Sequence, residues 1–204
     1  CLASYLVIRI IKTPQSNYLW LLLGLVCGIG LLNKYTMLLW GIGFIAGAIL
    51  TKQRHWVVGN YWPYLGFVCT VIVVLPTVLW QAEHQWPIFD QIVHTHTVVA
   101  DRNFRWEFLL NQFLLLHPLT APIWLAGFLY LMIKKAAAPF RLFFWQYLVL
   151  LLLMFFYGGR DYYLAPAYPL LFAAGAISIE RLLRSRHLHW LKPLYLMLLL
   201  QGGL

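Results

Sequence analysis

The chain has 204 residues, of which 62% are hydrophobic and only 10% are charged, against about 25% charged residues in ordinary soluble domains. This composition excludes a water-soluble globular domain and predicts an integral membrane protein. The net charge of +9 comes from cations in short loops beside apolar segments, so anionic lipid headgroups are a nearer partner for them than nucleic acid.

Apolar segments without acidic or basic side chains predict helices that cross the membrane. These segments are residues 57–82, 108–133, 142–159 and 162–179. At about 1.5 Å per helical residue, each can cross a hydrocarbon layer of ~30 Å, or nearly so. No strand-like alternation is present, so the predicted fold is all-α, a polytopic transmembrane helix bundle forming a single domain over residues 1–204. The chain begins with Cys1 and stops inside an apolar run, and we therefore expect an internal piece of a longer protein, truncated at both ends.

Lys34 is the only charged residue within the apolar stretch of residues 13–51. That stretch is too long for one span, and small or polar residues interrupt it at Gly28, Gly30 and Asn33. We expect two short helices with Lys34 near their outer turn. A lysine near the centre of a lipid-embedded helix costs roughly 2.5–3.5 kcal/mol, so it is retained where water, an anion or a carboxylate meets the ammonium group. Lys34 is therefore predicted to be functional.

Charged residues divide unevenly between the two ends of the predicted bundle. With helices that alternate in direction, eleven of the fifteen cations fall at one end: Arg9, Lys12, Lys52, Arg54, Lys134, Lys135, Arg141, Arg181, Arg184, Arg186 and Lys192. The other end receives Lys34, Arg102, Arg105 and Arg160, with the acids Glu83, Asp90, Asp101, Glu107 and Asp161. Because positive residues are retained in the cytoplasm during insertion, the cation-rich end is predicted to be cytoplasmic and the other end exterior.

The exterior loop of residues 81–105 is the longest polar segment. It concentrates residue types that hydrolases and transferases use: Glu83, His84, Asp90, His94, His96, Asp101, Arg102 and Arg105. Its aromatic residues, Trp80, Trp86, Phe89, Phe104 and Trp106, are equally typical of a connector anchored at the headgroup boundary. A catalytic loop and a simple interfacial connector both remain open.

A metal site in this loop would use His94 and His96, with Glu83 or Asp90 as a further ligand. Two histidines without a recognised spacing to a third ligand are more typical of interfacial hydrogen bonding, so neither a metal nor another cofactor is predicted. The three cysteines are too few and too scattered for a disulfide framework or a zinc site.

The segment of residues 158–169 breaks the helical pattern at the exterior end, between two spans. Paired glycines allow the chain to turn sharply. Pro166 and Pro169 interrupt regular helix, and the backbone groups that they free must line a cavity or pack on protein.

This exterior broken-helix segment also carries side chains that suit an anion. Arg160 supplies a delocalised cation, and Tyr162 and Tyr163 supply hydroxyl donors, which are the groups that best match phosphate oxygens. The alternative is that Arg160 pairs with Asp161 or extends to the headgroups, while the tyrosines belong to an interfacial aromatic belt.

Three segments, in order, resemble elements of bacterial family 39 glycosyltransferases of the GT-C superfamily, relatives of protein O-mannosyltransferases and of the lipid A aminoarabinose transferase. Residues 28–36 (GIGLLNKYT) resemble the family's glycine-rich, lysine-bearing element. Residues 79–86 (LWQAEHQW) resemble a span that ends in tryptophan, followed by a loop histidine and tryptophan. Residues 160–169 (RDYYLAPAYP) resemble its cation, tyrosine and proline element, with arginine where the family has lysine.

The resemblance implies an enzyme of the bacterial inner membrane that moves a sugar, with inversion, from a polyprenyl-phosphate donor to an acceptor at the extracytoplasmic face. It implies a donor-phosphate site at Lys34, Arg160, Tyr162 and Tyr163, and a substrate loop with Glu83, His84, Trp86 and Asp90. The family's acidic residue in a first exterior loop would lie before this chain, so the catalytic base stays unassigned. The acceptor can be protein, lipid or glycan. Two other classes remain open: a transporter or flippase of an anionic lipid-linked substrate, and a non-catalytic membrane subunit.

Overall fold

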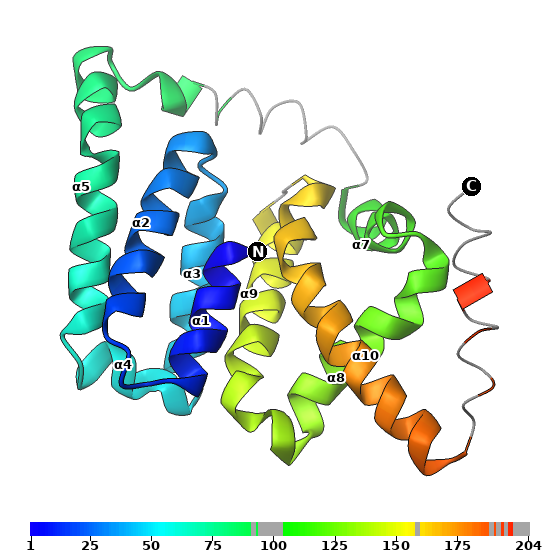
Figure 1. Ribbon diagram of the computed structural model, residues 1–204. Coiled ribbons are helices and arrows are strands. Elements are labelled where there is room, and N and C mark those ends of the chain that lie inside the picture. Colours follow the sequence, from blue (N-terminus) through cyan, green and yellow to red (C-terminus); the bar gives the residue numbers. More distant parts are fainter. Residues whose placement is uncertain are drawn as a thin grey trace.

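The computed structural model describes residues 1–90, 93, 104–157, 160–187, 190, 193 and 196–197. Within these residues every regular element is a helix, which confirms the all-α prediction (Figure 1). The α-helices are α1 (Leu2–Lys12), α2 (Tyr18–Asn33), α3 (Met37–Ile49), α4 (His55–Val58), α5 (Trp62–Glu83), α7 (Phe104–Leu115), α8 (Ala121–Ile133), α9 (Arg141–Tyr157) and α10 (Tyr168–Ser185). Short 3-10 helices join them: η1 (Lys52–Arg54), η2 (Pro118–Thr120), η3 (Lys135–Phe140) and η4 (Asp161–Ala167).

Three helical stretches in the described part of the chain are long and apolar enough to cross a membrane: Trp62–Glu83, Lys135–Tyr157 and Asp161–Ser185. The shorter apolar helices α2 and α3 form a hairpin whose turn contains Lys34, as predicted. Gly28 and Gly30, however, do not interrupt the helix as expected, because α2 runs unbroken through both to Asn33. The glycine at position 28 instead allows α2 to lie against Val73 of α5.

The predicted span of residues 108–133 is not a single straight helix. Arg105–Leu115 and Pro118–Ile133 form a pair bent by 81°. His117, at the bend, has a left-handed backbone (φ 65°), and the proline that follows it cannot donate a backbone hydrogen bond. The helix α7 therefore lies across the direction of α8, and its exposed side chains Trp106, Leu110 and Leu114 follow one another at a spacing of one helical turn.

The helices pack in pairs whose backbones approach closely at glycine. In the pair α2 and α5, Gly24 faces the backbone of Gly66, and Thr70 Oγ1 donates a hydrogen bond of 2.9 Å to the Gly24 carbonyl oxygen. In the pair α8 and α10, Gly127 and Gly175 face each other's helix backbone. The third pair is α3 and α9. Lipid tails are as apolar as leucine side chains, so close backbone contact through small residues is the usual way in which membrane helices associate.

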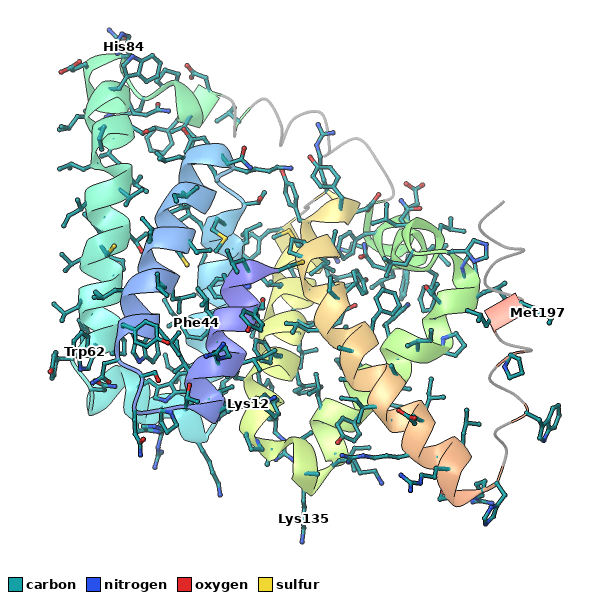
Figure 2. The ribbon with its side chains drawn as sticks, viewed as in Figure 1. Lys12, Phe44, Trp62, His84, Lys135 and Met197 are labelled. Carbon is teal, nitrogen blue, oxygen red and sulfur yellow. The ribbon has the colours of Figure 1, made fainter. Side chains whose placement is uncertain are left out.

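The two ends of the bundle differ in charge. The turn between α2 and α3 and the carboxyl ends of α5 and α9 lie at one end, which we call the Lys34 end (Figure 1). Lys12 and Lys135 lie at the opposite, cation-rich end, and His84 lies at the Lys34 end (Figure 2). This arrangement agrees with the predicted alternation of the helices, although Asp101, Arg102 and Lys192 lie outside the described residues.

Aromatic rings pack between α2, α3 and α4, from the first turn of α3 toward the cation-rich end. Trp56 contacts Trp20 with ring centroids 5.2 Å apart and Phe44 at 6.3 Å, and Phe44 stacks on Trp40 at 5.3 Å. Buried Gln53 ties the same end together by donating a hydrogen bond of 2.7 Å to the Pro139 carbonyl oxygen. These contacts join α2, α3 and α4 to one another and η1 to η3.

Candidate functional site

Lys34 occupies the turn between two short helices at the Lys34 end. Its backbone is extended (φ −156°, ψ 126°), and its N–H closes α2 by donating to the Gly30 carbonyl oxygen at 2.8 Å. Its carbonyl oxygen accepts from the Met37 N–H at 3.1 Å, which begins α3. The exposed side chain therefore leaves a turn that is fixed on both sides.

The lysine side chain meets the second predicted anion-binding element. Its Nζ lies 4.6 Å from the centroid of the Tyr162 ring, and Tyr162 belongs to η4. The ring is 41% exposed. A cation–π contact at an exposed position stabilises by only about 0.5–1 kcal/mol, so an anion with full negative charge can compete for this ammonium group.

The remaining two residues of the predicted donor set lie beside Tyr162. The rings of Tyr162 and Tyr163 meet edge to face with centroids 5.0 Å apart. The Tyr163 N–H donates to the Arg160 carbonyl oxygen at 3.0 Å. The structure thus brings the side chains of Lys34, Tyr162 and Tyr163 into contact, and Arg160 is joined to Tyr163 through its backbone.

Two residues that the sequence reasoning missed connect this site to the segment after α5. Gln81 Nε2 donates a hydrogen bond of 2.9 Å to the Tyr35 hydroxyl, directly beside Lys34. Gln81 is only 8% exposed, and its backbone carbonyl oxygen accepts a hydrogen bond of 2.8 Å from the Trp86 N–H. In the sequence, Gln81 stands out as an amide side chain at the end of an otherwise apolar span. The sequence does not show which residue it binds.

The segment after α5 turns tightly. Gln85 and Trp86 both have left-handed backbones, with φ values of 61° and 57°, which non-glycine residues rarely adopt. His84 stacks on Trp80 with ring centroids 4.3 Å apart, and Trp86 lies 6.1 Å from Phe89.

The predicted substrate-loop set is not gathered around Lys34. The ring contacts of His84 and Trp86 are with neighbours in their own segment, and Glu83 and Asp90 are exposed. The loop set lies at the same end of the bundle as the donor set and is joined to it through Gln81 and Tyr35.

We expect Tyr35→Phe to lower the free energy of unfolding by about 1–2 kcal/mol, because the substitution leaves the buried Gln81 Nε2 without its acceptor. Thermal unfolding in detergent measures the loss. The matched control is Tyr157→Phe, which removes a hydroxyl from a residue that is 74% exposed. Equal midpoints for the two variants would contradict a structural role for the Tyr35 hydroxyl.

Asp161 is hydrogen-bonded to α7. Its Oδ2 accepts a hydrogen bond of 2.8 Å from Asn111 Nδ2. An ion pair between Asp161 and Arg160, the alternative given by the sequence, would have to compete with this bond. His94 and His96 lie outside the described residues, as do Gly158 and Gly159. In the part of the chain that is described, no group of three or more His, Cys, Asp or Glu residues is arranged to hold a metal ion.

Comparison with known proteins adds one finding to this geometry. Residues 1–80 match the family model described as dolichyl-phosphate-mannose-protein mannosyltransferase. The match contains Lys34 and ends before the substrate loop and η4. No curated protein and no solved structure matches the chain. The match covers less than half of the chain. It agrees with the resemblance at the lysine-bearing element of residues 28–36, and it supports a membrane glycosyltransferase of the GT-C type.

Proposed function

We propose that the protein transfers a sugar from a polyprenyl-phosphate donor, and that Lys34, Arg160, Tyr162 and Tyr163 bind the donor phosphate. The observation that carries the proposal is the 4.6 Å approach of Lys34 Nζ to the Tyr162 ring. It joins a residue inside the region matched by the mannosyltransferase family to a segment far along the chain. The sequence by itself predicts anion-binding side chains in both segments.

The chemistry of sugar transfer explains why such a site would contain cations and hydroxyls. When the anomeric C–O bond breaks, its electron pair stays with the phosphate, whose negative charge grows in the transition state. Fixed ammonium, guanidinium and hydroxyl groups stabilise that charge without having to reorganise. The acceptor oxygen forms the new bond from the opposite face and loses its proton to a base that we leave unassigned.

Lys34 lies below the end of α5. The helix α5 has 22 residues against 16 in α2, and it extends past the α2–α3 turn (Figure 1). Lys34 is therefore recessed from the end of α5, although its side chain is exposed and open to a phosphate.

We propose that Glu83, His84, Trp86 and Asp90 contact the acceptor or the sugar from the neighbouring segment. We also propose that the Lys34 end faces the exterior of a bacterial inner membrane, because the cations at the opposite end fit the cytoplasmic side. This places the active face on the extracytoplasmic side.

A transporter or flippase is the second candidate class, and the packing of the cation-rich end argues against it. Transport requires a substrate route to both faces. A route to the cation-rich end would have to pass the ring contacts of Trp20, Phe44 and Trp56, which join α2, α3 and α4. The hydrogen bond from Gln53 to Pro139 joins η1 to η3 at the same end.

The test is an assay of the full reading frame that encodes this chain, reconstituted in vesicles with a radiolabelled polyprenyl-phosphate sugar. We expect label to leave the polyprenyl carrier and appear on an acceptor in a membrane extract. Movement of intact donor between leaflets without cleavage would identify a transporter instead. Binding without cleavage or movement would identify a non-catalytic subunit. Either of these results would overturn the proposal.

A further inference from the structure

Two amide side chains of α7 hold the first residue of η4. Asn111 Nδ2 donates to Asp161 Oδ2 at 2.8 Å, and Gln112 Nε2 donates to the Asp161 carbonyl oxygen at 3.2 Å. Asp161 is thus fixed through both its side chain and its backbone. Asp161 lies between Arg160 and Tyr162, two members of the proposed phosphate site.

Gln112 is also the centre of a buried polar network. It is 2% exposed, and its Oε1 accepts a hydrogen bond of 2.8 Å from the Tyr168 hydroxyl. The Tyr168 hydroxyl lies 3.3 Å from that of Tyr147 in α9. A buried network of this kind permits few other arrangements, because each displaced member would leave a polar atom unsatisfied. It joins α7, α9, η4 and α10.

The segment η4 depends on such external support. It is a 3-10 helix with a proline at position 166, and 3-10 helices have poorer hydrogen-bond geometry than α-helices. The directions of Arg160, Tyr162 and Tyr163 therefore depend on where Asp161 is held.

From these contacts we propose that Asn111 and Gln112 are positioning residues, which hold η4 so that Tyr162 lies over Lys34 and the phosphate site is formed. The proposal rests on the proposed function, since it assigns a role toward the same lipid phosphate. The two amides act through Asp161 and Tyr168 and do not contact the phosphate. The bent helix α7 thereby becomes part of the site without supplying a ligand.

The experiment exchanges donor and acceptor across the pair of Asn111 and Asp161. Asn111→Asp places two carboxylates face to face and should weaken binding of a long-chain polyprenyl monophosphate by about tenfold or more, the loss expected for a hydrogen bond to a charged group. Adding Asp161→Asn restores one amide and one carboxylate at the same two positions. We expect the double variant to recover affinity to within about twofold of the unmodified chain, since the bond is made again in the reverse direction.

Affinity is measured with radiolabelled polyprenyl monophosphate and the reconstituted full reading frame in nanodiscs, with thermal midpoints recorded in parallel. Asn17→Asp is the matched control, because it makes the same change before α2, where the asparagine side chain makes no capping hydrogen bond. If Asn111→Asp is too unstable to purify, Asp161→Asn alone supplies the test. It keeps an oxygen acceptor for Asn111, and we expect a loss of about threefold, the cost of replacing a charged acceptor by a neutral one.

The outcomes separate this inference from the function on which it rests. If Lys34→Met leaves affinity unchanged, the phosphate site itself is wrong and the positioning role fails with it. If Lys34→Met weakens binding but Asn111→Asp and the double variant both bind normally, the site stands and the positioning role is overturned. Loss of thermal stability without rescue of affinity in the double variant would show that the pair is only structural, which also overturns the inference.

Discussion

Replacing Lys34 by methionine is expected to lower kcat/KM for the polyprenyl-phosphate donor by roughly 100-fold, the loss typical when one charge-stabilising donor is removed from an active site. Methionine keeps an unbranched side chain of similar length but removes the ammonium group that lies 4.6 Å from the Tyr162 ring. Transfer of radiolabelled sugar in vesicles measures the effect. The loss should exceed any change in thermal stability, because Lys34 is exposed in the turn and its removal leaves the glycine-mediated helix pairs intact.

The matched control is Lys135→Met, since Lys135 lies at the cation-rich end, away from the proposed site (Figure 2). We expect that variant to retain nearly full activity. A second variant, Arg160→Gln, should also lower activity, and the double variant should lose less than the product of the two single effects if both cations bind the same phosphate. Normal turnover in the double variant would eliminate the phosphate site.

The second large effect concerns stability. Gly127→Val is expected to lower the free energy of unfolding by about 3 kcal/mol or more, because a Cβ at this position would meet the Leu171 carbonyl oxygen of α10. The backbone of one helix cannot move aside as a flexible side chain can, so α8 and α10 would have to separate. Unfolding in mixed detergent micelles measures the change.

Gly41→Val provides the control for this prediction. Gly41 lies in the middle of α3, and a Cβ there would meet nothing within 4 Å. Both substitutions introduce the same β-branched residue into a helix, so their intrinsic helix preferences cancel in the comparison. Equal losses in the two variants would mean that close packing at Gly127 does not stabilise the pair.

The position of Lys34 in the α2–α3 turn could be predicted from the cost of burying charge. A lysine within either apolar helix would have a higher free energy of insertion into the membrane. The bend between α7 and α8 was missed, because hydropathy records how apolar a segment is and carries no information on its direction. Pro118, directly after His117, was the local signal for that break.

Glycine shows a second limit of the sequence reasoning. In an apolar segment it can mark a break or a close helix contact, and Gly28 was assigned to the first class although it belongs to the second. The neighbour on α5 decides between the two meanings, and that neighbour is known only from the fold.

The candidate site could also be predicted only in part. Residue chemistry singled out Lys34 and Tyr162 separately, but their contact joins distant parts of the chain. The amides Gln81, Asn111 and Gln112 could not be assigned from the sequence, because a polar side chain in an apolar helix does not reveal its partner. Their hydrogen bonds to Tyr35 and Asp161 supply that information.

The shortness of the hairpin that carries Lys34 has a consequence for the surrounding bilayer. At about 1.5 Å per residue, the 16 residues of α2 span ~24 Å and the 13 residues of α3 span ~20 Å, whereas the hydrocarbon layer is ~30 Å thick. Hydrophobic mismatch of this size is relieved by local thinning of the membrane. Lipids beside the hairpin would then carry their headgroups down toward the lysine, so a phosphate could arrive there by lateral diffusion without being pulled out of its leaflet.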